Sequence, residues 1–268
     1  MPTISIASGR VTVVTLNRPE VRNAFNEQLI NELTDWARGV RADGAIRAVV
    51  LKGAGPVFCA GADLHWMSRV VGFTKDQNVA DARKAAELYQ ALDSLPVPLI
   101  GRIHGAALGG GAGLAAVCDV VIATEDATFG FTEVTLGIVP AMISPYVVRK
   151  IGLSAARELC LSGRRFRAQR AREIGLVHEV VAENELDEAV DRRVGEFAKA
   201  APSAVTAAKR VLSEIHGRQP ADVMSTTVDA SAAQRISAEG QEGMKAFLEK
   251  RRPSWVDAPP AAPGTRPA

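Results

Sequence analysis

The sequence predicts an α/β fold that continues into a largely helical C-terminal region, and three observations support this prediction. Short runs rich in Val, Ile and Leu each end at a turn signal, as buried strands do. Stretches with apolar residues at helical spacing lie between these runs. After about residue 140, almost every patterned stretch is helical. Strands that alternate with helices are typical of an α/β core.

The expected strands share an apolar composition and a turn that follows them. In the first half of the chain they are Val11–Leu16, Ala48–Leu51, Pro98–Ile103, Asp119–Ala123 and Thr128–Gly130. After residue 140, only Val177–Val181 resembles a strand.

Two helices are expected in the first half on the strength of their apolar stripes. Asn26–Val40 begins with Asn26 as a plausible cap, and Val79–Leu92 stops before Pro96. A short apolar helix is expected at Gly113–Val117. The remaining expected helices are Ser154–Leu161, Ala168–Ile174, Glu185–Lys199, Ser203–His216, Ala221–Ala233 and Glu239–Lys250.

Length and composition restrict the class of protein. The 268 residues suit one domain with a small appendage, because a single core stops growing near this size. The net charge of +2, with no long run of one sign, argues against a nucleic-acid or membrane-surface protein. No signal peptide or apolar span of about 20 residues is evident. We therefore expect a cytoplasmic protein, with a disordered Pro- and Ala-rich tail at 257–268.

The cysteines and histidines give no metal or disulfide signature. Cys59, Cys118 and Cys160 are widely spaced without a CxxC pair, so we expect three small buried residues and no metal site. A nucleophile made of Cys59 with His65 or His104 is a weaker alternative, because no orienting group is evident.

The glycine-rich turn Gly109–Gly113 follows the expected strand at Pro98–Ile103 and opens a helix. Glycines let backbone N–H groups approach a ligand, and helix N-termini favour negative charge. The spacing fits neither a Walker motif nor GxGxxG. Close packing of a helix on a sheet explains the glycines equally well.

The loop Ala60–Leu64 follows the strand Ala48–Leu51 and its Gly/Pro turn. It could supply a second N–H group beside the glycine turn. Two such donors form an oxyanion hole, in which one donor contributes about 2.7–4 kcal/mol to the transition state.

Glu133 is the only carboxylate from Ala127 to Arg157. A carboxylate alone in an apolar stretch has a raised pKa, which suits a general acid/base near neutral pH. A structural ion pair with a nearby arginine is an equal alternative. Asp63 and Asp119 follow glycine-rich or apolar runs, and each is more typical of a cap or turn than of a catalyst.

Together these segments resemble the crotonase (enoyl-CoA hydratase/isomerase) superfamily over Val11 to Trp255. The resemblance is specific because the segments match in order and spacing. They are Leu16–Pro19 with Asn23–Phe25, Phe58–Leu64, His104–Asp119, Phe129–Pro140 and Glu242–Phe247. The stretch Glu133–Tyr146 is similar to the bacterial methylglutaconyl-CoA and isohexenylglutaconyl-CoA hydratase branch.

The resemblance implies a spiral of ββα units over 1–200 and a helical trimerisation region over 201–256. It implies an acyl-CoA substrate, no separate cofactor, and a homotrimer or dimer of trimers. By this resemblance, the oxyanion hole is formed by the N–H groups of Ala62 and Gly110, next to Gly109, and Glu133 is the acid/base. The residues expected to bind the substrate or its CoA are Arg22, Ala24, Ala60, Gly61, Asp63, Leu64, Gly109, Phe247 and Lys250.

One position departs from the family pattern. Typical hydratases carry a second glutamate in the helix after the glycine turn, where this chain has Gly113. We expect a hydratase that adds water to an enoyl-CoA, with a branched or carboxylated acyl group such as methylglutaconyl. The alternatives are a Δ3,Δ2-enoyl-CoA isomerase that uses Glu133 alone and a non-catalytic acyl-CoA-binding protein.

Overall fold

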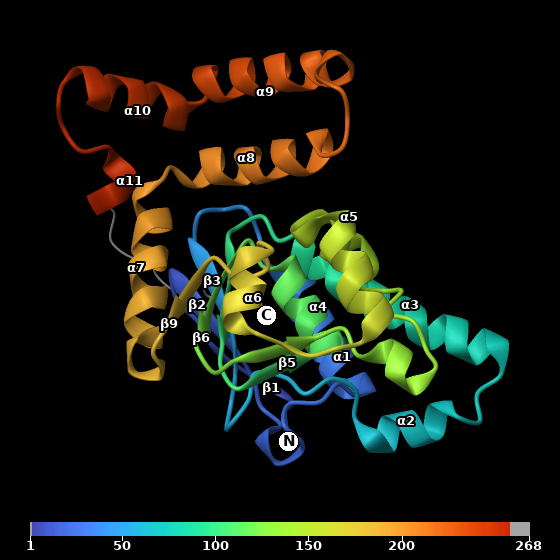
Figure 1. Cartoon of the computed structure of the whole chain (residues 1–268). Coiled ribbons are helices and arrows are strands. Elements are labelled where there is room, and N and C mark those ends of the chain that lie inside the picture. The colour runs from blue at the N-terminus through green and yellow to red at the C-terminus, as the bar shows by residue number, and fades with distance from the viewer. Residues whose placement is uncertain (1, 258–268) are drawn as a thin grey trace, which may run out of the picture.

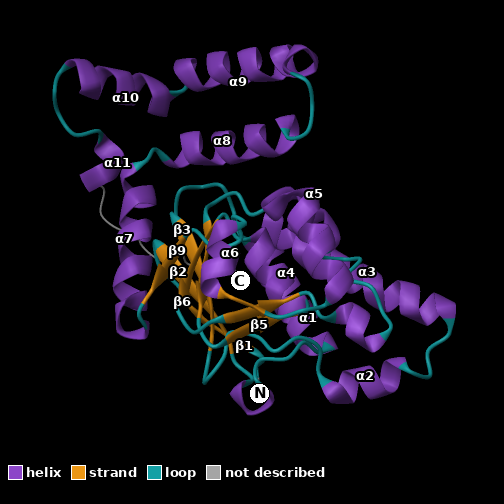
Figure 2. Cartoon of the chain, viewed as in Figure 1, coloured by secondary structure: helices purple, strands orange, loops and turns teal. Residues whose placement is uncertain are grey.

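The computed structural model describes residues 2–257, and its core is built on two β-sheets (Figures 1 and 2). The larger sheet has the strand order β1-β2-β3-β4-β6-β9, and the smaller sheet has the order β5-β7-β8. In the larger sheet all neighbouring strands are parallel except the β1–β2 pair. The strands are β1 (Ile4–Ala7), β2 (Val11–Leu16), β3 (Ala48–Gly53), β4 (Leu99–Ile103), β5 (Ala106–Leu108), β6 (Val120–Thr124), β7 (Thr128–Gly130), β8 (Phe166–Arg167) and β9 (Glu179–Val181).

Helices follow most of the strands and make up the whole C-terminal region (Figure 2). The α-helices are α1 (Glu27–Gly39), α2 (Leu64–Val70), α3 (Lys75–Asp93), α4 (Gly110–Val117), α5 (Ser144–Ser162), α6 (Ala168–Glu173), α7 (Leu186–Lys199), α8 (Pro202–Ile215), α9 (Met224–Ile236), α10 (Ala238–Leu248) and α11 (Ser254–Asp257). Short 3₁₀ helices lie at Pro19–Val21, Glu133–Leu136, Glu183–Glu185 and Pro220–Val223. No helix within residues 2–257 is long and apolar enough to cross a membrane.

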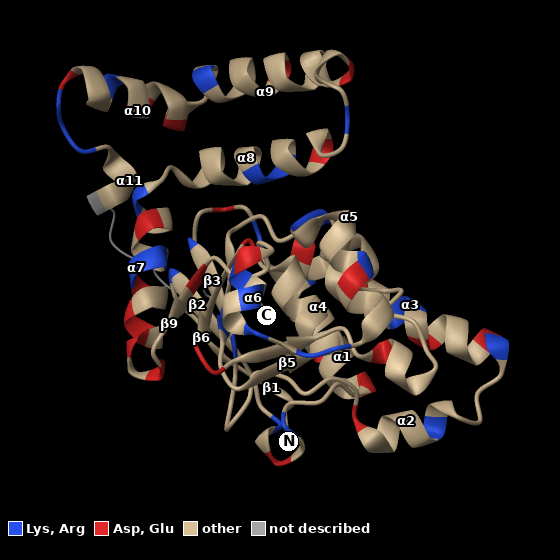
Figure 3. Ribbon diagram, in the orientation of Figure 1, with Lys and Arg blue, Asp and Glu red and all other residues tan. Residues whose placement is uncertain are grey.

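Both faces of the larger sheet are covered by helices. Alternate residues of the central strands point to opposite faces, so Ala48 and Val50 pack with α7, while Val49 and Leu51 join the larger core. That larger core includes buried residues of α1, α3 and α4. Because both faces are buried, the parallel strands are nearly continuous apolar runs, as the sequence predicted. Charged residues of both signs alternate along α7 on the outer surface (Figure 3).

Most of the predicted elements are present, with shifted ends. The strand Val11–Leu16 has its predicted bounds, and Asn26 caps α1 by accepting from the N–H of Leu29. The prediction of a single strand after residue 140 is wrong, because the two-residue β8 pairs with β7. The strand β1 and the helix α2 were not predicted. In β1 only Ile4 is buried, and α2 buries no residue, so neither element is held by a buried apolar face.

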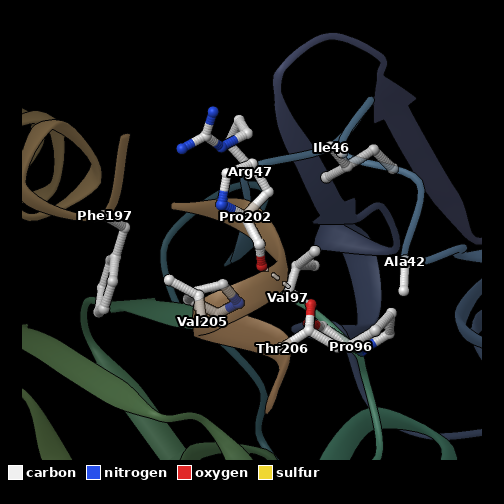
Figure 4. A pocket seen from close by; sticks show the side chains of 11 residues that line it. Ala42, Ile46, Arg47, Pro96, Val97, Phe197, Pro202, Val205 and Thr206 are labelled. Atoms are coloured by element: carbon white, nitrogen blue, oxygen red, sulfur yellow. Dashed lines mark hydrogen bonds between the residues drawn. The ribbon is translucent and has the colours of Figure 1, made fainter. Parts of the chain in front are cut away.

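The C-terminal helices leave the core at one junction and form an arm that Figure 1 shows beyond the sheet. At this junction the Thr206 hydroxyl donates to the carbonyl of Pro96 at 2.7 Å (Figure 4). One turn further along α8, Lys209 forms an ion pair with Asp119 at 2.6 Å. The predicted tail 257–268 lies outside the described residues except for Asp257, which ends α11.

Close backbone approach fixes the position of α4. A Cβ atom at Gly111 would lie 2.6 Å from the carbonyl oxygen of Cys59, so only glycine fits there. The Cys59 segment is held against β5, because Cys59 N–H donates to Ala106 and Leu108 N–H donates to Cys59. The glycine turn therefore does pack a helix closely against a neighbouring strand-like segment.

We predict that Gly111→Ala lowers the free energy of unfolding by about 1–3 kcal/mol, because the added methyl overpacks this contact. Gly195→Ala in α7 is the matched control. A Cβ at Gly195 meets nothing within 4 Å, so the same change should stabilise the helix by about 0.5–1 kcal/mol. Denaturant unfolding of both variants measures the difference, and equal effects would contradict the close approach.

Candidate active site

Two glycine-containing turns and one carboxylate meet at Gly109. A Cβ atom there would lie 3.5 Å from Oε1 of Glu133 and 3.9 Å from the Cα of Gly61. Gly61 and Gly109 both have positive φ, at 102° and 51°, which side-chain-bearing residues avoid. Ala62, Gly110 and Glu133 line one cavity of about 140 Å³ between α1, α3, α4 and the 3₁₀ helix Glu133–Leu136. The structure thus brings together the three residues that the sequence singled out for catalysis.

The N–H group of Ala62 is oriented by its neighbours. Phe25 N–H donates to Gly61, and Asp63 N–H donates to Phe25, so the loop pairs with Phe25 through the residues on either side of Ala62. In such a parallel bridge the central residue directs its own N–H to the opposite side. Within residues 2–257, the Ala62 N–H donates to no other group.

The N–H group of Gly110 begins α4. The N–H groups of the first helical turn have no intrahelical partner, and they carry the positive end of the helix dipole. Gly109 N–H donates to Gly130 and Gly113 N–H donates to Gly109, while the N–H of Gly110 donates to nothing in the described chain. Two backbone donors therefore line the same cavity, as an oxyanion hole requires.

The loop that carries Ala62 is held by a buried polar cluster. Asp63 caps α2 by accepting from the N–H groups of His65 and Trp66, and it forms an ion pair with Arg18 at 2.7 Å. Burial alone would raise the pKa of Asp63, but these donors outweigh it and hold the pKa below its usual value. Asn23, fully buried, donates to the carbonyls of Ala54 and Val57. Asp63 is thus a cap, as its sequence position indicated.

Glu133 is half-buried, and its Oε2 atom is buried without a hydrogen-bond partner among the described residues. Burial raises the pKa of its carboxyl group, and its own backbone N–H offsets this only in part. No arginine or lysine of residues 2–257 forms an ion pair with it, so the structural alternative for Glu133 is not supported. A carboxylate with a raised pKa is a stronger base than an ordinary one, which suits it to accept and return a proton.

The position of the second family glutamate is filled by side chains. A Cβ atom at Gly113 would lie 2.2 Å from Cγ2 of Ile143 and 3.0 Å from Cε1 of Tyr89. No side chain larger than hydrogen fits there without moving both neighbours. Among the described residues that line this cavity, Glu133 is therefore the only one with a carboxylate.

Tyr89 and Phe25 pack the far side of the oxyanion turn, and sequence reasoning missed both. The Tyr89 hydroxyl donates to the carbonyl of Gly110 at 3.0 Å, and burial raises its pKa well above its usual range, so it stays protonated. A Cβ at Gly110 would lie 2.8 Å from the Tyr89 hydroxyl oxygen and 3.0 Å from Cε2 of the Phe25 ring. Tyr89 was placed on a predicted helix, but nothing in a helical pattern indicates which residue faces a site.

The remaining predicted residues fall into two groups. Arg22 and Ala24 lie beside the Ala60–Leu64 loop, since Ala60 N–H donates to Arg22 and Arg18 donates to Ala24. Phe247 lies in the last turn of α10, and Lys250 follows that helix. Helix α10 is far from α2 and α3 (Figure 1), and neither residue lines the cavity. The Cys59 alternative is not supported, because burial raises the pKa of its thiol to about 12.

Comparison with known proteins identifies this architecture. The enoyl-CoA hydratase/isomerase family matches residues 7–258. The chain belongs to the enoyl-CoA hydratase/isomerase family. It is 35% identical to the 2,3-dehydroadipyl-CoA hydratase of Escherichia coli (strain K12), over 92% of this chain and 95% of that protein.

Solved structures of the family have the same fold. A structure described as Pseudomonas aeruginosa AtuE matches with a TM-score of 0.92 and 36% identity, covering 95% of this chain and 100% of the other. An enoyl-CoA hydratase from Shewanella pealeana matches with a TM-score of 0.89 and 37% identity, covering 94% and 96%. The predicted superfamily, crotonase-like fold and enzyme class are confirmed, while the methylglutaconyl branch stays a prediction.

We predict that Tyr89→Phe lowers kcat about 10-fold with little change in KM, because the Gly110 turn loses the hydrogen bond that positions its N–H. Tyr146→Phe is the matched control. Its ring lies 6.1 Å from that of Tyr89, and its hydroxyl makes no hydrogen bond within residues 2–257. Steady-state kinetics on an enoyl-CoA measures kcat and KM of both variants. Equal kcat values for Tyr89→Phe and Tyr146→Phe would contradict a positioning role for Tyr89.

Proposed function

We propose that this chain is an enoyl-CoA hydratase that adds water across the 2,3 double bond of an enoyl-CoA thioester. The observation that carries the proposal is the shared cavity of the Ala62 and Gly110 N–H groups and the unpaired, buried carboxylate of Glu133. A non-catalytic acyl-CoA-binding protein would have no use for an unpaired buried carboxylate, which costs stability.

In the first step the thioester oxygen accepts hydrogen bonds from the Ala62 and Gly110 N–H groups. The Glu133 carboxylate takes a proton from water, and the water oxygen bonds to C3. The electron pair of the double bond moves toward the thioester oxygen, where the two donors stabilise the enolate. In the second step protonated Glu133 returns the proton to C2, which gives the 3-hydroxyacyl-CoA.

The CoA portion is assigned to the loop beside this cavity. Arg22 accepts from the N–H of Ala60 in the segment Ala60–Leu64, and the left-handed backbone of Arg22 and Asn23 turns the chain toward Ala24 there. Because α10 lies far from α2 and α3 (Figure 1) and neither Phe247 nor Lys250 lines the cavity, we assign these two residues to the CoA of a neighbouring subunit in a homotrimer or dimer of trimers. The exposed Phe247 side chain, at 82%, is consistent with this assignment.

A second candidate is a Δ3,Δ2-enoyl-CoA isomerase. The packing of Ile143 and Tyr89 at Gly113 favours it, because a reaction with one proton carrier needs only Glu133. In that reaction Glu133 would take a proton from C2 of a 3-enoyl-CoA and return it to C4, with the same enolate held by the two N–H groups.

We predict that Glu133→Gln lowers hydration of crotonyl-CoA by at least about 100-fold, because the proton carrier is lost. Glu188→Gln on exposed α7 is the matched control and should leave the rate unchanged. In the wild type, kcat/KM should fall as pH decreases through the raised pKa of Glu133, above its usual 4.5, because the reaction needs the ionised form.

The contribution of Glu133 to the stability of the fold should depend on pH in the opposite direction to kcat/KM. A raised folded-state pKa means that protonated Glu133 favours the fold below its usual pKa, and that this contribution is lost as pH rises through the raised pKa. At pH 7, Glu133→Gln should therefore raise Tm. Undiminished hydration together with an unchanged Tm would refute the assigned role.

The two candidate reactions are separated by their products in deuterated water. A hydratase converts a 2-enoyl-CoA to the 3-hydroxyacyl product with deuterium at C2. An isomerase leaves that substrate unhydrated and converts a 3-enoyl-CoA to the 2-enoyl isomer. Mass spectrometry of both incubations decides between them, and 3-hydroxyacyl-CoA as the product is the result we expect.

A further inference from the structure

The acyl end of the cavity has an apolar lining. Around Glu133, Ala62 and Gly110 its wall is formed by aliphatic and aromatic side chains of four segments. These are Phe25, Ile30, Trp66, Ala85, Leu88, Tyr89, Ile138, Val139, Pro140, Met142 and Ile143. No lysine, arginine or histidine of residues 2–257 lines it.

The side-chain polar atoms of this lining, apart from the Glu133 carboxylate, already have partners. The indole N–H of Trp66 donates to Asp81 at 3.2 Å, and the Tyr89 hydroxyl donates to the Gly110 carbonyl. The N–H groups of Ala62 and Gly110 are taken by the thioester oxygen in the proposed reaction. Among the described residues that line the cavity, a negatively charged group on the acyl chain would therefore meet no free side-chain donor.

The charges around this end of the cavity are negative. Glu133 carries the reacting carboxylate, and Asp81 lies behind Trp66. Burial is the main reason that the pKa of Asp81 is raised, and the charge of Glu27 adds to this. Two cations act on Asp81: Lys84 is already paired with Glu27 at 2.5 Å, and Arg69 of α2 does not line the cavity. An acyl carboxylate would be both desolvated and repelled here.

The size of the cavity limits the acyl chain. Its volume of about 140 Å³ is close to the roughly 150 Å³ of an engineered apolar cavity that binds benzene. The side chains of Ile138 and Val139 at its rim are 53% and 66% exposed, so apolar surface also continues outward from the cavity. A short or branched hydrocarbon chain fits this space.

We propose that this enzyme selects short, uncharged acyl chains and rejects enoyl-CoA thioesters whose acyl chain ends in a carboxylate. This inference rests on the proposed hydratase function. It separates the chain from the relative named 2,3-dehydroadipyl-CoA hydratase, whose named substrate carries a carboxylate, despite 35% identity. Of the two expectations from sequence, it favours the branched chain over the carboxylated one.

The test compares two substrates of equal shape. In glutaconyl-CoA the acyl chain ends in a carboxylate, and in 5-methylhex-2-enoyl-CoA an isopropyl group replaces it. We expect kcat/KM for the uncharged substrate to exceed that for the charged one by roughly 100-fold or more, because the carboxylate enters unpaired. Equal values, or a preference for glutaconyl-CoA, would overturn the proposal.

Binding of the saturated analogues keeps this test separate from the reaction. Glutaryl-CoA and 5-methylhexanoyl-CoA cannot be hydrated, so calorimetric Kd values report selectivity whether or not the chain is a hydratase. Weaker binding of glutaryl-CoA with no hydration of either enoyl substrate would refute the hydratase alone. Equal Kd values alongside hydration would refute the selectivity alone.

A gain-of-function variant tests the cause of the selectivity. Ile138→Arg places a cation at the exposed rim, where a longer polar side chain has room. We expect it to improve kcat/KM for glutaconyl-CoA about 10-fold relative to the isopropyl analogue, because the carboxylate gains a partner. Leu153→Arg on α5 is the control, since Leu153 is 62% exposed and does not line the cavity. Equal effects of the two variants would assign the change to net charge and contradict the proposal.

Discussion

The site depends on one set of backbone hydrogen bonds, which ties the Cys59–Asp63 segment to two other parts of the chain. On one side Cys59 exchanges hydrogen bonds with β5 through Ala106 and Leu108, and on the other side Phe25 pairs with Gly61 and Asp63. This places Ala62 opposite the first turn of α4 without the help of any catalytic side chain. Two side chains stabilise this backbone arrangement. Asp63 caps α2, and the Tyr89 hydroxyl donates to the carbonyl of Gly110. A preorganised pair of N–H groups needs no reorganisation when charge develops, which is the source of its catalytic effect.

The same site also contains a group that lowers the stability of the fold. Glu133 has a buried oxygen without a partner among the described residues, and its ionised form is disfavoured by burial. Functional positions often carry such strain, and the surrounding core supplies the stability that offsets it. Here that core is continuous, because the parallel strands are buried on both faces by α7 on one side and by α1, α3 and α4 on the other.

The sequence predicted the elements whose side chains alternate between core and solvent or between two cores. It located β2, whose residues alternate between half-buried and buried, and the apolar stripe of α1, because both patterns are local in the sequence. It missed α2, which buries nothing, and β1, whose partner β2 supplies most of the pattern. The residues alone did not decide whether Glu133 and the glycine turn serve catalysis or structure. Only the resemblance to the family predicted that both belong to one active site. Tyr89 and Ile143 could not be found this way, because only the packing of α3 and α5 against α4 brings them to Gly113.

The packing around Gly113 also constrains how this protein can change over generations. Because Ile143 and Tyr89 occupy the volume beside that glycine, a carboxylate cannot arise there by one replacement without a clash in the core. A lineage in this state would first have to open the space by shortening Ile143, which leaves a cavity beside the oxyanion turn and loses stability before any second carboxylate can act. The order of substitutions therefore matters, because the intermediate with a shortened Ile143 is less stable than the present chain. Ile143 in this way makes the effect of a replacement at Gly113 depend on a second residue.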